Sequence, residues 1–241
     1  MRFSRRLTLL ATTLLAAGSS AGSAFACDAG TYSYAGMAAG TNAFGVGAVV
    51  RPAATGFAVR AGHVAGWVGV GGPGEGPGGS DEWIQIGLSA FPELMGNDVY
   101  YEVKTPEGDP TYHRVRANVP GGTSLRVAVL EMRNRVGYWR VWVNGSPASE
   151  PVFLRGSHNR WRPVVTAESW DGGSTTCNDY LYTFSHVSIA SAPGGGWTRL
   201  LANNMAPIVA TNSRVMAHRS AGFFAAGGGA SALRALTDFG G

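Results

Sequence analysis

The sequence is poor in lysine and cysteine. Lys104 is the only lysine, and Cys27 and Cys177 are the only cysteines among the 241 residues. A lysine-based mechanism therefore has a single candidate, and a thiol catalyst is not favoured because no CxxC spacing is present. Beyond the N-terminal region the chain also lacks a run of about 20 apolar residues, so no membrane-spanning helix is predicted.

The usual sequence signatures of catalysis and metal binding are absent as well. Beyond residue 26 the chain has no GxSxG nucleophile elbow, no HExxH pair and no Walker loop. The glycine-rich stretch at residues 69–79 is not followed by a helix that could direct amides at a phosphate. No cofactor or metal is therefore expected, since the five histidines show no metal-ligand spacing. They are His63, His113, His158, His186 and His218.

The first 26 residues have the three parts of a secretion signal. Three arginines within the first six residues precede an apolar stretch at residues 7–17, and Ala24-Phe25-Ala26 supplies a small-x-small cleavage site. We therefore expect a secreted, extracellular protein whose mature chain begins at Cys27. A cysteine at the cleavage point is also typical of lipoprotein signals, which lead to a lipid anchor. The bulky Phe25 fits such a signal poorly.

Removal of this segment changes the charge of the protein. The whole chain has a formal net charge of +4, and its first 26 residues hold three arginines and no acids, so the mature net charge is +1. This excludes the usual electrostatic argument for a nucleic-acid partner. The remaining arginines concentrate in the middle of the chain, where they favour a solvated sheet face or, alternatively, a surface for an anionic ligand. They include Arg114, Arg116, Arg126, Arg133, Arg135, Arg140, Arg155, Arg160 and Arg162.

Two cysteines in a secreted chain favour a disulfide. A bond between Cys27 and Cys177 would close a loop of about 150 residues and stabilise the fold by several kcal/mol. It would attach the new N-terminus to the loop after Thr176. We expect the folded chain to be a monomer.

The pattern of apolar residues is that of strands. Short apolar or alternating runs recur between Gly, Pro, Asn and Asp residues, and Asn144-Gly145 is a hairpin signal. The pattern predicts an all-β, antiparallel two-sheet sandwich over residues 27–225, followed by a flexible Gly/Ala-rich tail at residues 226–241. The predicted strands cover residues 63–70, 82–90, 99–103, 124–133, 138–143, 164–170, 180–190 and 220–225.

Two of these strands carry one functional polar group beside a tryptophan. In residues 83–88 the two-residue period of a strand puts the isoleucines and the leucine on one face and Gln85 on the other, with Trp83. In residues 165–170 it puts Glu168 on one face with Trp170. A solvated sheet face dotted with polar residues gives the same pattern, so a functional site and a plain outer face both stay open.

Six short motifs follow one another along the chain. They are Trp67-Val68-Gly69-Val70, Ile84-Gln85-Ile86-Gly87-Leu88, Tyr101-Glu102 with Pro106, Gly122-Thr123-Ser124-Leu125-Arg126-Val127, Ala167-Glu168 with Trp170, and Phe184-Ser185-His186-Val187. In order and spacing they resemble the eqolisin family of glutamic peptidases, which are secreted, acid-acting enzymes with a concanavalin A-like, jelly-roll sandwich. The resemblance covers roughly residues 66–192.

The resemblance implies a hydrolytic site built from two side chains. Glu168 would be the general base that takes a proton from the attacking water, and Gln85 would donate its amide to the developing oxyanion. The substrate would be a polypeptide. The residues that would bind it are Trp67, Trp83, Tyr101 and Glu102.

The chain departs from the family's pattern at several positions. Gly71 and Ser89 replace two acids, Val103 replaces an aromatic residue, and Trp170 stands one place further from the glutamate. These departures speak against strongly acid-optimum proteolysis. Two alternatives to a peptidase therefore stay open. One is a non-catalytic module that binds glycan or cell-wall material through the same aromatic face, and the other is a structural protein of the cell surface.

Overall fold

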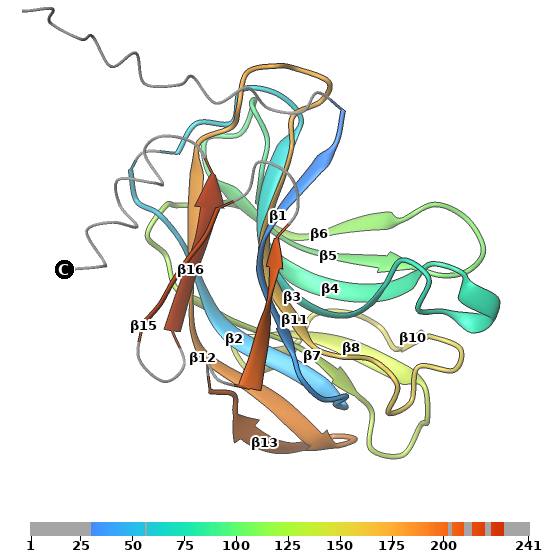
Figure 1. The fold of residues 1–241 in the computed structure, drawn as a ribbon. Coiled ribbons are helices and arrows are strands. Elements are labelled where there is room, and N and C mark those ends of the chain that lie inside the picture. Colours follow the sequence, from blue (N-terminus) through green and yellow to red (C-terminus); the bar gives the residue numbers. More distant parts are fainter. Residues whose placement is uncertain (1–29, 56, 202–203, 210–213, 220–222, 229–241) are drawn as a thin grey trace, which may run out of the picture.

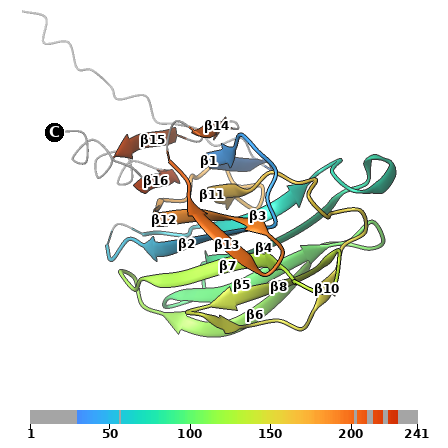
Figure 2. The ribbon, with the colours of Figure 1, turned by 90° about the horizontal axis from the view of Figure 1, so that it is seen from below.

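The computed structural model describes residues 30–55, 57–201, 204–209, 214–219 and 223–228. Within these ranges the chain forms two antiparallel sheets that pack face to face (Figures 1 and 2). The first sheet has the strand order β14-β1-β11-β3-β4-β5-β6, and the second has the order β10-β8-β7-β2-β12-β16-β15, with β13 paired to β12 and β9 paired to β8. This confirms the predicted antiparallel sandwich.

The strands of the first sheet are β1 (Tyr32–Ala39), β3 (His63–Gly72), β4 (Glu82–Ala90), β5 (Asn97–Lys104), β6 (Thr111–Val119), β11 (Val164–Trp170) and β14 (Met205–Val209). Those of the second sheet are β2 (Gly45–Pro52), β7 (Leu125–Glu131), β8 (Tyr138–Val143), β9 (Ser146–Pro147), β10 (Val152–Phe153), β12 (Tyr180–Ala192), β13 (Gly195–Arg199), β15 (Arg214–Arg219) and β16 (Phe223–Gly228). A short 3-10 turn, η1 (Pro77–Gly79), lies between β3 and β4.

The structure adds strands that the sequence did not predict. β1 and β2 are rich in Gly and Ala, and β6 is largely exposed and polar, so none of the three shows a clear strand pattern. β16 continues to Gly228, three residues beyond the predicted end, because it pairs with β12 up to that point. In the described ranges, no helix is long and apolar enough to cross a membrane.

Two predictions lie outside the described residues. The signal segment and Cys27 belong to residues 1–29, and most of the predicted tail belongs to residues 229–241. Secretion and the Cys27–Cys177 bond therefore stay predictions.

The core lies between the sheets and follows from strand alternation. On β4, Ile84, Ile86 and Leu88 are fully buried against the second sheet, as predicted. Val127 and Val129 of β7, in the second sheet, are also fully buried and face the first sheet. Each such side chain contributes about 1.5–3 kcal/mol. Their burial leaves the alternate residues of β4 on the face that points away from the core.

Tyr182 ties the second sheet to the back of the first. Its ring fills the space beside Gly66 of β3, where an added Cβ would lie 2.4 Å from the ring. Its hydroxyl donates a 2.9 Å hydrogen bond to Asn97 Oδ1 on β5. Burial raises the pKa of Tyr182 well above its ordinary value, so the hydroxyl stays a donor. This contact fixes β3 and β5 from the inside.

Candidate active site

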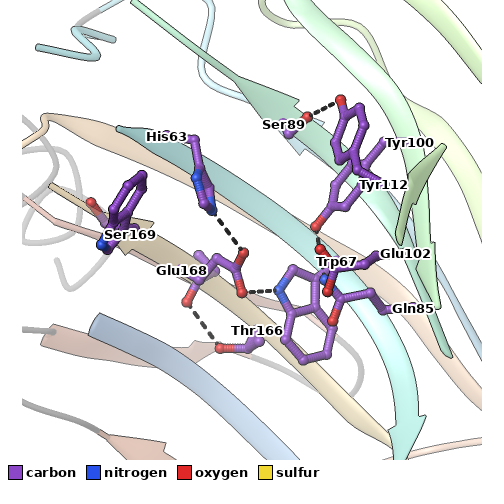
Figure 3. A network of polar contacts seen from close by, with 12 residues as sticks. His63, Trp67, Gln85, Ser89, Tyr100, Glu102, Tyr112, Thr166, Glu168 and Ser169 are labelled. Atoms are coloured by element: carbon purple, nitrogen blue, oxygen red, sulfur yellow. Dashed lines mark hydrogen bonds and ion pairs between the residues drawn. The ribbon is translucent and has the colours of Figure 1, made fainter. Parts of the chain in front are cut away.

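The outer face of the first sheet gathers acids and aromatic side chains. Strand alternation turns Glu168 of β11, Trp67 of β3, Gln85 of β4 and Glu102 of β5 to this face (Figure 3). Glu168 and Gln85 are each only 6% exposed, although their face points away from the core. We call this set of four residues the acidic face.

Glu168 is held by two residues of the neighbouring strand. It lies opposite Ala65, so Trp67 and His63 stand two places to either side of its partner. Trp67 Nε1 donates a 2.7 Å hydrogen bond to Glu168 Oε2, and His63 Nε2 lies 3.4 Å from Oε1. The small Ala65 leaves room between them. The carboxylate therefore has a fixed orientation, with one neighbour on each oxygen.

Gln85 is held by a buried tyrosine. Its Nε2 donates a 3.1 Å hydrogen bond to Tyr100 Oη, and Tyr100 stacks on Tyr112 with ring centroids 4.9 Å apart. Burial raises the pKa of Tyr100 well above its ordinary value, so the phenol is neutral. Gly69 lies opposite Gln85, and an added Cβ there would lie 2.9 Å from Gln85 Cβ. The glycine provides the space that this side chain occupies.

Trp67 lies between the two proposed catalytic residues. Figure 3 shows its indole between Glu168 and Gln85, which come from strands on either side of β3. Gly87 is the partner of Trp67 on β4, and an added Cβ there would lie 2.7 Å from Trp67 Cβ. The structure thus brings Gln85 and Glu168 to one face of one sheet. Among the described residues no hydrogen bond joins them directly.

Glu102 forms a second carboxylate site on the same face. Trp83 Nε1 donates a 2.9 Å hydrogen bond to Glu102 Oε1. Burial raises the pKa of Glu102, and the charge of Glu168 raises it further, whereas the Trp83 hydrogen bond and His63 oppose the rise. Each carboxylate of the acidic face is therefore capped by a tryptophan from the adjacent strand.

Tyr101 does not belong to the acidic face, contrary to the sequence-based expectation. Because successive side chains of β5 point to opposite faces, Tyr101 packs against the core and stacks on His113 with centroids 4.4 Å apart. Tyr100 takes its place beside Gln85. The two-residue period of residues 99–103, counted from Glu102, would have identified Tyr100.

An aromatic row borders the acidic face at β1. Tyr32 stacks on Tyr34 and on Trp170, with centroids 6.0 and 6.3 Å apart. His63 lies against both Tyr32 and Trp170, at 5.8 Å from each ring. Burial raises the pKa of Tyr34, and the nearby Glu168 adds to the rise. Sequence reasoning missed this row because it did not predict β1 and gave His63 only an isolated role.

The described residues contain no group of three or more His, Cys, Asp or Glu side chains that could hold a metal ion. The acidic face offers the carboxylates of Glu168 and Glu102, the amide of Gln85 and the indole of Trp67. A buried carboxylate can act as a base, and a fixed amide can donate a hydrogen bond to an oxyanion.

The fold is similar to that of two solved peptidases. Scytalido-glutamic peptidase, solved with a peptide-based transition-state analogue, matches with a TM-score of 0.55 and 16% identity over 80% of this chain and 97% of that chain. SCP-B, a member of the eqolisin family solved with the tripeptide Ala-Ile-His, matches with a TM-score of 0.50 and 16% identity over 81% of this chain and 96% of that chain. At such low identity the likeness shows an eqolisin-like fold alone.

A polysaccharide-degrading enzyme has a more distant likeness to this fold. A β-glucanase of Bacillus licheniformis matches at 12% identity over 59% of this chain and 64% of that chain. Its TM-score of 0.39 is too low to bear on function. The sequence matches no protein-family model and no curated protein sequence.

Proposed function

We propose that the protein is a secreted glutamic peptidase in which Glu168 activates water and Gln85 stabilises the oxyanion. The observation that carries the proposal is the setting of Glu168, a carboxylate that is 6% exposed, bonded by Trp67 and placed on the same sheet face as Gln85. The eqolisin-like fold supports it, since the solved relatives are peptidases.

In the proposed reaction, water lies over the Trp67 indole between the two side chains. The Glu168 carboxylate takes a proton from this water as its oxygen attacks the scissile carbonyl carbon. The carbonyl oxygen becomes an oxyanion and accepts a hydrogen bond from Gln85. The protonated Glu168 then gives the proton to the leaving amine nitrogen as the C–N bond breaks, which restores the carboxylate.

The surrounding hydrogen bonds suit these roles. Gln85 Nε2 carries two hydrogens, and its bond to Tyr100 uses only one of them. The second is free for an oxyanion. Trp67 donates a hydrogen bond to Glu168 Oε2, and His63 Nε2 lies 3.4 Å from Oε1, so both oxygens of the base have a fixed neighbour. Such fixed donors lower a barrier because they need no rearrangement during the reaction.

Digestion of a denatured protein tests the proposal. The secreted protein and its Glu168→Gln variant would be incubated with the substrate at several pH values between about 2 and 7. The wild type should produce new peptides, and the variant should be slower by about 10²–10⁴ because it has no general base. Equal digestion by both proteins would contradict the proposal.

Secretion is part of the proposal and has a separate test. The intact mass of the protein from the culture medium should correspond to a chain that begins at Cys27, and reduction should add two hydrogens when Cys27 and Cys177 are bonded. A mass that retains residues 1–26 or includes a lipid would contradict it.

A non-catalytic glycan-binding module is the second candidate. The row of Tyr32, Tyr34 and Trp170 favours it, because Tyr32 is 46% exposed and stacked aromatic rings offer flat apolar faces to a sugar. Retention on insoluble polysaccharide that is lost in Tyr32→Ala and Trp170→Ala, but kept in Glu168→Gln, would support this alternative.

A further inference from the structure

A groove of about 630 Å³ lies on the outer face of the second sheet. Strand alternation turns Arg126, Ala128 and Leu130 of β7 outward, while their neighbours enter the core. Residues of β2, β8, β12 and β13 complete the groove. A volume of this size is typical of sites for small molecules. We call it the basic groove.

The floor and one wall of the basic groove are apolar. Gly47 and Ala128 are paired residues of β2 and β7, and their small size leaves space above the sheet for a ligand. Trp197 of β13 lies against this floor, since an added Cβ at Gly47 would be 3.6 Å from its ring. Val49 and Leu130 extend the apolar surface. The groove can therefore hold an apolar body.

Three arginines line the same groove. They are Arg126 and Arg133, which are exposed, and Arg140, which is half-buried. Arg140 has one described ion pair, a 3.9 Å contact with the exposed Glu150, and its buried Nε has no hydrogen-bond partner among the described residues. Trp142 Nε1, also in the groove lining, is a second such donor.

No acid in the groove lining is available to neutralise these arginines. The lining includes one carboxylate, that of Glu131, which is fully buried. It accepts a 2.6 Å hydrogen bond from the Gly137 amide and contacts His158 Nδ1 at 2.9 Å. Apart from the 3.9 Å contact between Arg140 and the exposed Glu150, no described ion pair compensates the arginines of the groove, so its open side keeps an excess of positive charge, which favours an anion.

We propose that the basic groove binds small organic anions that join an apolar body to a carboxylate. The apolar body would lie on Gly47, Ala128 and Trp197, and the carboxylate would pair with Arg140 and Arg133. A guanidinium binds a carboxylate through two parallel hydrogen bonds, which makes arginine well suited to this role. The site is on the opposite sheet from Glu168 and does not depend on the proposed peptidase activity.

Calorimetric titration with four matched probes tests the proposal. Octanoate combines the apolar chain with the carboxylate, 1-octanol keeps only the chain, acetate keeps only the charge, and octyltrimethylammonium reverses the charge. Octanoate should bind about tenfold or more tightly than each of the others, as expected for one charge-assisted pair. Binding of octanol or of the cation equal to that of octanoate would overturn the proposal, as would equal binding of acetate.

Variants locate the binding. Arg140→Gln and Arg133→Gln should each weaken octanoate binding several-fold, and the double variant should weaken it further. Arg162→Gln is the matched control, because Arg162 is exposed and lies outside the groove. Glu168→Gln should leave octanoate binding unchanged. Binding that survives the double arginine variant, or that is lost in Glu168→Gln, would place the anion elsewhere and contradict the proposal.

Discussion

The acidic face and the basic groove are built by the same rule and differ in how they treat charge. Both consist of the alternate residues that the core leaves outside, one on each sheet. On the acidic face the carboxylate of Glu168 is buried and bonded to an indole. In the basic groove Arg126 and Arg133 remain exposed above an apolar floor.

This difference shows what burial does to a charged group. A buried acid has fixed neighbours and a set orientation, which suits proton transfer. An exposed guanidinium keeps its charge and its mobility, which suits the capture of an anion. The formal net charge of +4 does not reveal this separation, because two acids lie on the acidic face and three arginines line the basic groove.

The largest expected effect separates the two faces by activity. Replacing Gln85 with Ala removes the proposed oxyanion donor and should lower kcat by about 10²–10³. Octanoate binding in the basic groove should not change. The measurement is peptide hydrolysis beside calorimetric titration of the same preparations. Asn42→Ala, which removes an exposed amide, is the control, and a kcat within twofold of wild type in Gln85→Ala would count against the proposed role.

A second effect concerns the stability of the acidic face. An alanine Cβ at position 87 would lie 2.1 Å from the Gly66 carbonyl oxygen and 2.7 Å from Trp67 Cα, so Gly87→Ala should destabilise the fold by about 1–3 kcal/mol. At Gly72 of β3 the nearest atom would be Glu75 Cγ at 3.8 Å, so Gly72→Ala should cost much less. Chemical denaturation measures both. Similar losses in the two variants would show that the close fit around Trp67 is not the cause.

A smaller effect concerns the indole that holds the base. Trp67→Phe keeps an aromatic ring and removes the donor to Glu168 Oε2, so kcat/KM should fall about tenfold. Trp83→Phe removes the corresponding donor to Glu102 and should cost less. Steady-state hydrolysis of one peptide substrate compares the two. A larger loss in Trp83→Phe would mean that Glu102 matters more than Glu168.

The smallest effect is a pH dependence of stability. Folding raises the pKa of Glu102 above its ordinary value of 4.5, mainly through burial, so the folded state favours the protonated acid. Its contribution to stability is present below pH 4.5 and is lost as the pH rises through the higher folded pKa. Glu102→Gln lacks this loss, so its melting temperature relative to wild type should increase from pH 4 to pH 7. Glu107→Gln, at an exposed acid, is the control, and the same trend in both variants would contradict the effect of burial at Glu102.

Much of the sandwich could be predicted from the sequence, because alternation and turn residues report it directly. Asn144 and Gly145 have positive φ angles of 49° and 85° and form the tight turn between β8 and β9, as their order predicts. The inward face of β4 followed from Ile84, Ile86 and Leu88. β1 did not follow, since its Ala and Gly residues are buried by neighbouring strands rather than by any pattern of their own.

The candidate site was predicted in part. Gln85, Glu168, Trp67, Trp83 and Glu102 do share one face. His63 could not be assigned to it, because its position beside Glu168 depends on the register between β3 and β11, residues about 100 apart in the chain. Tyr101 was misplaced by one residue, which on a strand means the opposite face.

A comparison of Glu168→Gln with Glu102→Gln decides whether Glu168 is the general base, because a tryptophan donates to each of these acids on the same sheet face. The measurement is the initial rate of peptide hydrolysis by the two variants and the wild type under identical conditions. We expect a loss of about 10²–10⁴ for Glu168→Gln and of less than about tenfold for Glu102→Gln. Equal losses, or a greater loss in Glu102→Gln, would contradict the assignment of Glu168 as the base.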